Sequence, residues 1–160
     1  MHTSHPDRPH AMRRPHLSLV GALVLLLWGQ LAQATGGQVR IPVAEDFQAD
    51  VKTIAGERIA LLVAVTREGC PYCARLKREI LLPMLKSGEY EGKVVMRELI
   101  IEPESSVVDF EGQALSSADV AARYSVEITP TVLLLDHTGR SLHPPITGIN
   151  TAEMYGYYLD

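Results

Sequence analysis

Two cysteines separated by two residues are the side chains of this sequence best suited to covalent chemistry. Cys70 and Cys73 are the only cysteines in the 160 residues, and they lie between an apolar run and a segment with helical spacing. Three residues apart at the start of a helix, the two sulfur atoms fall on the same side of the first turn, close enough to bridge. Unpaired N–H groups and the positive end of the helix dipole lower the pKa of a thiol placed there. We therefore expect Cys70 to be the exposed nucleophile and Cys73 the more buried thiol that resolves a mixed disulfide.

Several other interpretations of the cysteine pair compete with redox activity. A structural disulfide would close a very short loop, and such a bridge stabilises a fold only weakly. A zinc site would need His137 and His143, but 63 residues separate Cys73 from His137, against about 12–15 in a zinc finger. The position of the pair between a strand and a helix favours redox activity. The main alternative from another class is a non-enzymatic carrier that holds Cu(I) between the two thiolates, since soft ligands suit that ion.

The elements that position the pair are predicted to alternate between helices and strands. Apolar runs predict strands at 59–65, 93–101 and 131–136, and a fourth strand at 141–147 follows a turn. Apolar spacings of three and four predict helices at 46–55, 71–86, 117–124 and 151–159, with Pro83 expected to kink or end the second. Long crossovers permit parallel pairing, and the last hairpin supplies an antiparallel edge. The predicted fold class is therefore α/β, a small mixed central sheet with helices on both faces. Residues 102–115 are expected to form a long loop.

Residues 1–34 have the order of a secretory signal peptide. A basic stretch ending at Arg13-Arg14 precedes the apolar run 17–28, and Ala32-Gln33-Ala34 fits the small-residue cleavage pattern. The apolar run is shorter than the ~20 residues of a membrane-spanning helix, so cleavage is favoured over a retained anchor. The predicted organisation is a signal peptide at 1–34, a linker at 35–45 and one domain at 46–160. Export implies a compartment in which disulfides persist.

The charge balance excludes a broad class of partners. The formal net charge is −4, and it becomes −6 when residues 1–34 are removed, so the basic excess of a nucleic-acid-binding protein is absent. Four of the six histidines also lie in residues 1–34, so the N-terminal histidine cluster is not a metal site in the exported protein. Met84 and Met96 are expected to be core residues rather than metal ligands.

From about residue 59 to residue 159 the sequence resembles the thioredoxin superfamily. The resemblance rests on the CPYC tetrad at 70–73, on Ile128-Thr129-Pro130-Thr131 before the third strand, and on the 136–140 turn that leads towards Gly148. It implies a thioredoxin-like fold in which Pro130 is cis and its loop faces the disulfide. It also implies that the substrate chain is bound by the residues beside that disulfide: Thr129, Pro130, Pro71 and Tyr72.

A closer resemblance is to exported thioredoxin-like proteins of bacterial periplasms, including those attached to sulfur-oxidation systems. The stretch 108–112 and the Tyr-rich end 155–159 carry this likeness. The sequence departs from cytoplasmic thioredoxin in three places: Gly69 replaces the tryptophan before the first cysteine, Pro71-Tyr72 replaces the Gly-Pro between the cysteines, and Ala64 replaces the buried acid six residues before the first cysteine. Proton handling at Cys73 must therefore use water, Glu68 or another group.

These observations predict a periplasmic thiol–disulfide oxidoreductase that acts through Cys70 and Cys73. A reductase direction follows from the resemblance alone. The implied partners are protein or small thiol substrates and a membrane or periplasmic electron donor, with no nucleic acid and no stable membrane insertion after signal cleavage. The Cys70–Cys73 disulfide is the expected redox centre, and neither a separate cofactor nor a metal is expected.

Overall fold

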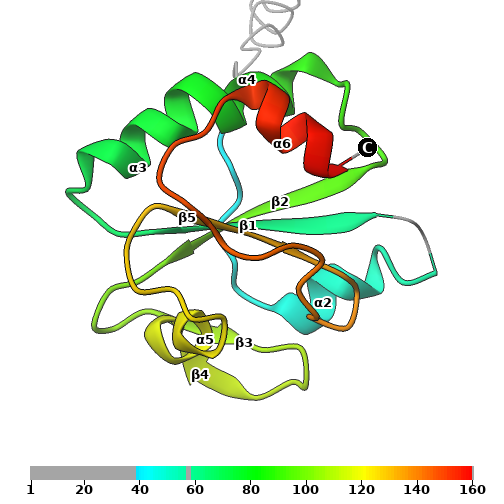
Figure 1. Ribbon diagram of the computed structural model, residues 1–160. Coiled ribbons are helices and arrows are strands. Elements are labelled where there is room, and N and C mark those ends of the chain that lie inside the picture. The colour runs from blue at the N-terminus through cyan, green and yellow to red at the C-terminus, as the bar shows by residue number, and fades with distance from the viewer. Residues whose placement is uncertain (1–38, 57–58, 160) are drawn as a thin grey trace, which may run out of the picture. The chain divides into compact units, whose positions relative to one another are not determined.

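A four-stranded mixed sheet forms the centre of the domain that the structure describes (Figure 1). The computed structural model describes residues 39–56 and 59–159. The strands are β1 (Ala60–Thr66), β2 (Val94–Ile100), β5 (Thr131–Leu135) and β6 (Ile146–Thr147), in the order β2-β1-β5-β6. β1 and β2 run parallel, and β5 is antiparallel to both β1 and β6. The predicted α/β class with a mixed central sheet is confirmed.

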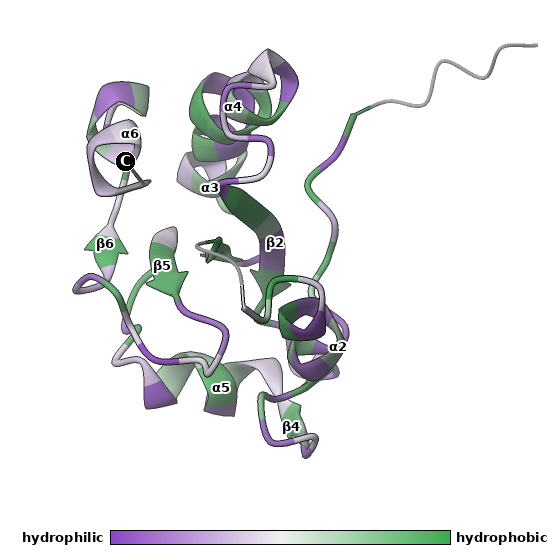
Figure 2. Ribbon diagram, turned by 90° about the vertical axis from the view of Figure 1, so that its right-hand side faces the viewer, coloured by the Kyte–Doolittle hydropathy of each residue, from purple (hydrophilic) through white to green (hydrophobic). Residues whose placement is uncertain are grey.

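Helices cover both faces of this sheet (Figure 2). One face carries a helical run composed of α3 (Pro71–Leu76), the π-helix η1 (Lys77–Leu81) and α4 (Leu82–Ser87), together with α6 (Ala152–Leu159). The other face carries α2 (Phe47–Lys52) and α5 (Ser117–Arg123). Because successive side chains of a strand point to opposite faces, β1 contributes to two cores. Leu61, Val63 and Val65 pack with α2 and α5, whereas Leu62 and Ala64 pack with the long helical run.

The helix after the cysteines does not end at Pro83. The prediction was a helix at 71–86 that kinks or ends there, but the chain continues through η1 into α4, with Pro83 in the first turn of α4. In η1 the Leu82 N–H donates to the Lys77 carbonyl, five residues back. This wider turn comes just before a residue that lacks an N–H and would clash with the carbonyl four residues earlier, so it accommodates the proline. The run ends instead at Gly88, whose φ of 71° is left-handed.

Residues 102–115 form ordered structure where a long loop was expected. They contain β3 (Ser106–Val108) and the start of β4 (Ala114–Ser116), which pair as an antiparallel hairpin. The Asp109 carboxylate organises the turn between them by accepting hydrogen bonds from the backbone N–H groups of Glu111 at 2.9 Å and Gln113 at 2.8 Å. The turn is therefore organised by hydrogen bonds to the Asp109 side chain. The two strands are too short to show the alternating pattern that would have predicted them.

The segment before α2 lies along the edge of the sheet. Val43 forms a parallel bridge with Glu98 of β2, and Ile41 and Ala44 are buried. The segment expected as a linker therefore contacts the sheet from residue 41 onwards, five residues before Asp46 caps α2. The predicted signal peptide and its cleavage position lie outside the described residues. Within the described residues, no helix is both long enough and apolar enough to cross a membrane.

Candidate active site

The two cysteines form a disulfide in the first turn of α3. β1 ends at Thr66, and a short turn with Gly69 at a φ of 66° brings Cys70 to the N-cap of the helix. The Cα atoms of Cys70 and Cys73 are 5.3 Å apart, within the range of disulfides. Cys70 Sγ also accepts a hydrogen bond from the backbone N–H of Cys73 at 3.1 Å. The helix start therefore offers a donor to the sulfur that would carry negative charge after reduction.

The two sulfur atoms differ in their access to solvent. Cys70 is half-buried, whereas Cys73 is only 2% exposed. Cys73 lies on the side of α3 that carries the buried Leu76, facing the sheet. An attacking or incoming sulfur can therefore reach Cys70 and not Cys73, which is the arrangement that the predicted roles require.

A loop from the other side of the sheet faces the disulfide. The Thr129–Pro130 peptide bond is cis, as the family resemblance implied. The carbonyl oxygen of Thr129 lies 4.0 Å from Cys70 Sγ, and the Thr129 hydroxyl lies 3.9 Å from the same atom. The loop is held by a 2.8 Å hydrogen bond from the Gly148 N–H to the Pro130 carbonyl and by one from Thr131 Oγ1 to the Ile128 carbonyl.

Exposed side chains border the disulfide on both sides. Tyr72 between the cysteines is 65% exposed, and Ile128 beside the cis proline is 62% exposed. Pro71 is exposed as well, whereas Thr129 is half-buried and Pro130 is buried, so the four residues expected to bind substrate differ in how much of their side chain they offer. A groove of about 500 Å³ extends from this region and is lined by residues of α5, of the loop before Pro130 and of the turn before Cys70, among them Ala118, Ile128, Thr129 and Arg67.

The turn before Cys70 is tied to the end of β2. The Glu68 backbone N–H donates to the Glu102 carboxylate at 2.8 Å, and the Ile101 N–H donates to the Thr66 carbonyl at 2.8 Å. Glu68 itself is exposed. Sequence reasoning missed Glu102, whose contribution depends on the parallel pairing of β1 and β2 and has no local signal.

A buried carboxylate lies beneath the helix that carries the cysteines. Glu98 of β2 is 6% exposed, and its Oε1 accepts hydrogen bonds of 2.6 Å from Thr66 Oγ1 and from Lys77 Nζ. Its register partner in β1 is Ala64, the position that lacks an acid. The available signal was an acidic residue beside Arg97 in a strand whose other residues are apolar, which sequence reasoning did not use.

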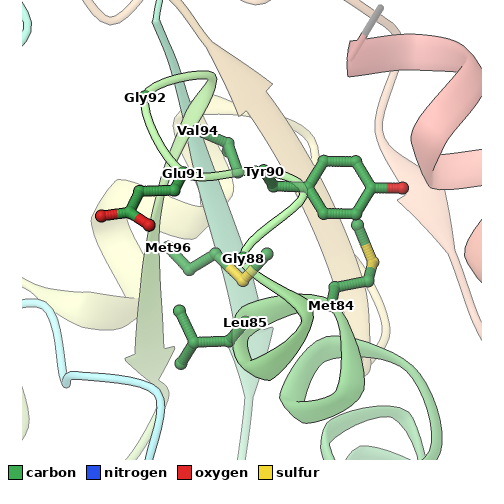
Figure 3. A pocket seen from close by; sticks show the side chains of 8 residues that line it. All are labelled: Met84, Leu85, Gly88, Tyr90, Glu91, Gly92, Val94 and Met96. Atoms are coloured by element: carbon green, nitrogen blue, oxygen red, sulfur yellow. The ribbon is translucent and has the colours of Figure 1, made fainter.

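The two methionines expected to be core residues lie away from the disulfide. Met84 and Met96 contribute to a pocket of about 400 Å³ with Tyr90 and Glu91, at the end of α4 and the start of β2 (Figure 3). The disulfide lies near the opposite, C-terminal ends of β1 and β2. Both methionines are buried. Across residues 39–56 and 59–159, no three or more His, Cys, Asp or Glu side chains gather in a way that could hold a metal ion.

The histidines considered for a zinc site lie apart from the cysteines in the described structure. His137 is exposed in the turn after β5, and the ring of His143 contacts that of Tyr158 with centroids 4.0 Å apart.

Comparisons with known proteins agree on one family. The family model described as thioredoxin-like domain matches residues 47–160. A thioredoxin-like protein from Clostridium perfringens has a similar structure, with 22% identity, a TM-score of 0.51, and coverage of 81% of this chain and 89% of that one. StoA from Bacillus subtilis has 16% identity, a TM-score of 0.50, and coverage of 67% of this chain and 87% of its own. At these identities the two structures support the fold alone. No curated protein matches the chain.

Proposed function

The chain belongs to the thioredoxin-like domain family, and from that premise we propose that it is a thiol–disulfide oxidoreductase acting through Cys70 and Cys73. The observation that carries this proposal is the disulfide in the first turn of α3, with one half-buried and one buried sulfur, opposite the cis Thr129–Pro130 bond. A disulfide that only stabilised the fold would need neither the difference in solvent exposure between its two sulfur atoms nor the loop of Thr129 and Pro130 that faces them.

The geometry supports exchange in two steps. In the reductase direction, the Cys70 thiolate attacks one sulfur of a substrate disulfide, forms a mixed disulfide and releases the other substrate sulfur as a thiolate. Cys73 then loses its proton and attacks Cys70 Sγ, forming the Cys70–Cys73 bond and releasing the second substrate thiolate. Two electrons pass from the protein to the substrate. An electron donor restores the dithiol by the reverse steps.

The substrate chain is proposed to lie over Thr129, Pro130, Pro71 and Tyr72. Its backbone would extend beside Thr129, as a peptide added to exposed strand-like backbone does. This supports protein disulfides as substrates, because an extended peptide uses the surface on both sides of Cys70, whereas a small thiol needs only the sulfur.

The proposed compartment is the periplasm, and the proposed direction is reduction. The signal-peptide pattern of residues 1–34 supports export. In that setting a membrane or periplasmic donor must supply the electrons, and a disulfide-bearing protein of a sulfur-oxidation system is one proposed substrate. A fusion of residues 1–34 to alkaline phosphatase, which is active only after export, tests the compartment.

Turnover of a protein disulfide tests the proposed activity. With dithiothreitol as donor, the protein should accelerate reduction of insulin, and Cys70→Ser should abolish the acceleration. Reduced Cys73→Ala, freed of dithiothreitol before insulin is added, should accumulate a mixed disulfide at Cys70. Equal activity of wild type and Cys70→Ser would refute the proposal. Absence of exchange, together with Cu(I) held by the reduced wild type, would support the thiolate carrier instead.

Tyr72 gives a matched test of the substrate surface. Tyr72→Ala should raise KM for a protein disulfide, while Tyr157→Ala, at an 80% exposed tyrosine of α6, should leave KM unchanged. Equal effects of the two substitutions would remove Tyr72 from the proposed binding surface.

A further inference from the structure

Glu98 is a buried titratable group that the two exchange steps leave unused. Its backbone is fixed on both sides, by β1 through the parallel register and by the segment before α2. On that second side the Glu98 N–H donates to the Pro42 carbonyl at 2.8 Å, and the Ala44 N–H donates to the Glu98 carbonyl at 2.9 Å. A buried charge at a fixed position is costly unless it is paired. Such a carboxylate therefore calls for an explanation beyond packing.

Lys77 links this carboxylate to the buried cysteine. The Lys77 backbone N–H donates to the carbonyl of Cys73, so the two residues are one helical turn apart and share a face of the helix. From there the Lys77 ammonium reaches down to Glu98 Oε1 at 2.6 Å. Glu98 and the buried Met96 are two residues apart on β2, so both side chains point to the face covered by the helical run.

The space around Glu98 connects it to both the active-site turn and the solvent. Thr66, the last residue of β1 before the active-site turn, donates to the same carboxylate oxygen, and Ala64, the register partner of Glu98, is buried on the face covered by the helical run. On the outer side, Glu98 and Lys77 line a pocket of about 330 Å³ with Ile41, Val43 and Leu82. That volume holds several water molecules at about 30 Å³ each.

The resolving step requires a group that accepts the proton of Cys73. Cys73 must lose a proton before it attacks, and at 2% exposure its thiol has little direct access to bulk water. As the anionic partner of an ion pair, Glu98 is a proton acceptor. The other charged groups lining its pocket are the cations Lys77 from the helix and Arg40 from the segment before α2, while β1 contributes only the Thr66 hydroxyl nearby.

We propose that Glu98 handles the proton of Cys73 in the resolving step, an inference that rests on the proposed oxidoreductase function. The S–H bond of Cys73 breaks and an O–H bond forms on Glu98, directly or through water. The Cys73 thiolate attacks Cys70 Sγ, the mixed disulfide breaks, and the substrate sulfur leaves as a thiolate. Glu98 then returns the proton to solvent through its pocket, while Lys77 and Thr66 hold the carboxylate in place.

The two steps are separated by reacting the reduced protein with 5,5′-dithiobis(2-nitrobenzoate) in a stopped-flow instrument. Attack by Cys70 releases a first equivalent of thionitrobenzoate, and resolution by Cys73 releases a second. Glu98→Gln keeps an oxygen that can accept both hydrogen bonds but removes the base. We expect its first phase to be unchanged and its second phase to slow about tenfold to hundredfold at pH 7. The second phase should recover as pH rises, because hydroxide then takes the proton.

Control variants distinguish proton handling from structural support. Glu98→Asp, which keeps a carboxylate, should restore much of the second phase. Asp109→Asn removes another buried carboxylate, from the hairpin on the far side of the sheet, and should leave both phases unchanged. Should Glu98→Gln fail to fold, Lys77→Gln removes one of the two groups that hold the carboxylate but keeps the base, so its second phase should slow by less than the tenfold expected for Glu98→Gln.

Three results would contradict, respectively, the role of Glu98, its role as a base rather than a structural partner, and the proposed function. A second phase in Glu98→Gln with wild-type rate and pH dependence would overturn the role of Glu98. A fast second phase lost equally in Lys77→Gln and Glu98→Gln would make the pair structural only. A wild type that releases no second equivalent would contradict the proposed function itself.

Discussion

Reducing the Cys70–Cys73 bond should leave the fold intact at a small cost in stability. The bridge spans a sequence separation of 3, so it closes one of the shortest loops possible. Loop-closure entropy for about four residues amounts to roughly 2 kcal/mol at 25 °C. This is an upper limit, because the Cys73 N–H can still donate to Cys70 Sγ after reduction, and a donor to a thiolate is stronger than one to a neutral sulfur. Neither hydrophobic core depends on the bond.

Urea unfolding with and without dithiothreitol measures this cost. With a slope of about 1–3 kcal/mol per molar urea, the midpoint should fall by about 2 M or less, and the slope should stay unchanged. The Cys70→Ser variant, which cannot form the bridge, should show no effect of the reductant. A reduced protein without a cooperative transition would show that the disulfide is a structural element and would refute the reasoning.

Three further predictions concern reactivity, packing and pH. Cys70 should have a thiol pKa below the ~8.5 of free cysteine and should be alkylated before Cys73, and mapping the labelled peptide at neutral pH checks this, since labelling of Cys73 first would reverse the roles. Gly139→Ala should cost about 1–3 kcal/mol in a urea melt, because the added Cβ would lie 2.6 Å from the Phe110 ring at a φ of 79°. Burial raises the pKa of Asp136, but hydrogen bonds within its turn outweigh this and lower it to about 2 from 3.8, so its stabilisation is complete above pH 4 and is lost as pH falls through 2. Thermal melts should show that Asp136→Asn lacks this part of the acid dependence, and an identical acid profile would contradict the assignment.

The sequence was sufficient for the elements whose signal is local. The strands β1 and β5 are apolar runs, and β2 is apolar apart from Arg97 and Glu98, so the observed bounds of all three differ from the prediction by at most one residue at each end. Asp46 is of a residue type favoured at helix N-caps, and its carboxylate accepts the Ala49 N–H at 2.8 Å. The cis bond at Pro130 followed from family resemblance, because nothing local distinguishes it from a trans proline.

The features that the sequence did not reveal depend on contacts between distant segments. The hairpin of β3 and β4 has only three residues in each strand, too few for an alternating pattern, and is held by Asp109 in the turn. The wide turn of η1 accommodates Pro83. The sequence predicted a kink or an end at this proline, but not the π-helical turn before it. Glu98 lies in a largely apolar strand, and its partner Lys77 lies 21 residues earlier, so the ion pair exists only once the helix packs over β2.

An equilibrium titration of the Cys70–Cys73 pair against a dithiothreitol or glutathione redox buffer tests the central claim most directly. The account predicts a reversible two-electron transition at a potential in the range of exchange proteins, roughly −270 to −120 mV, with the folded structure kept in both states. A bond that stays oxidised until the potential falls well below about −300 mV, as structural disulfides do, would contradict a redox role for these cysteines.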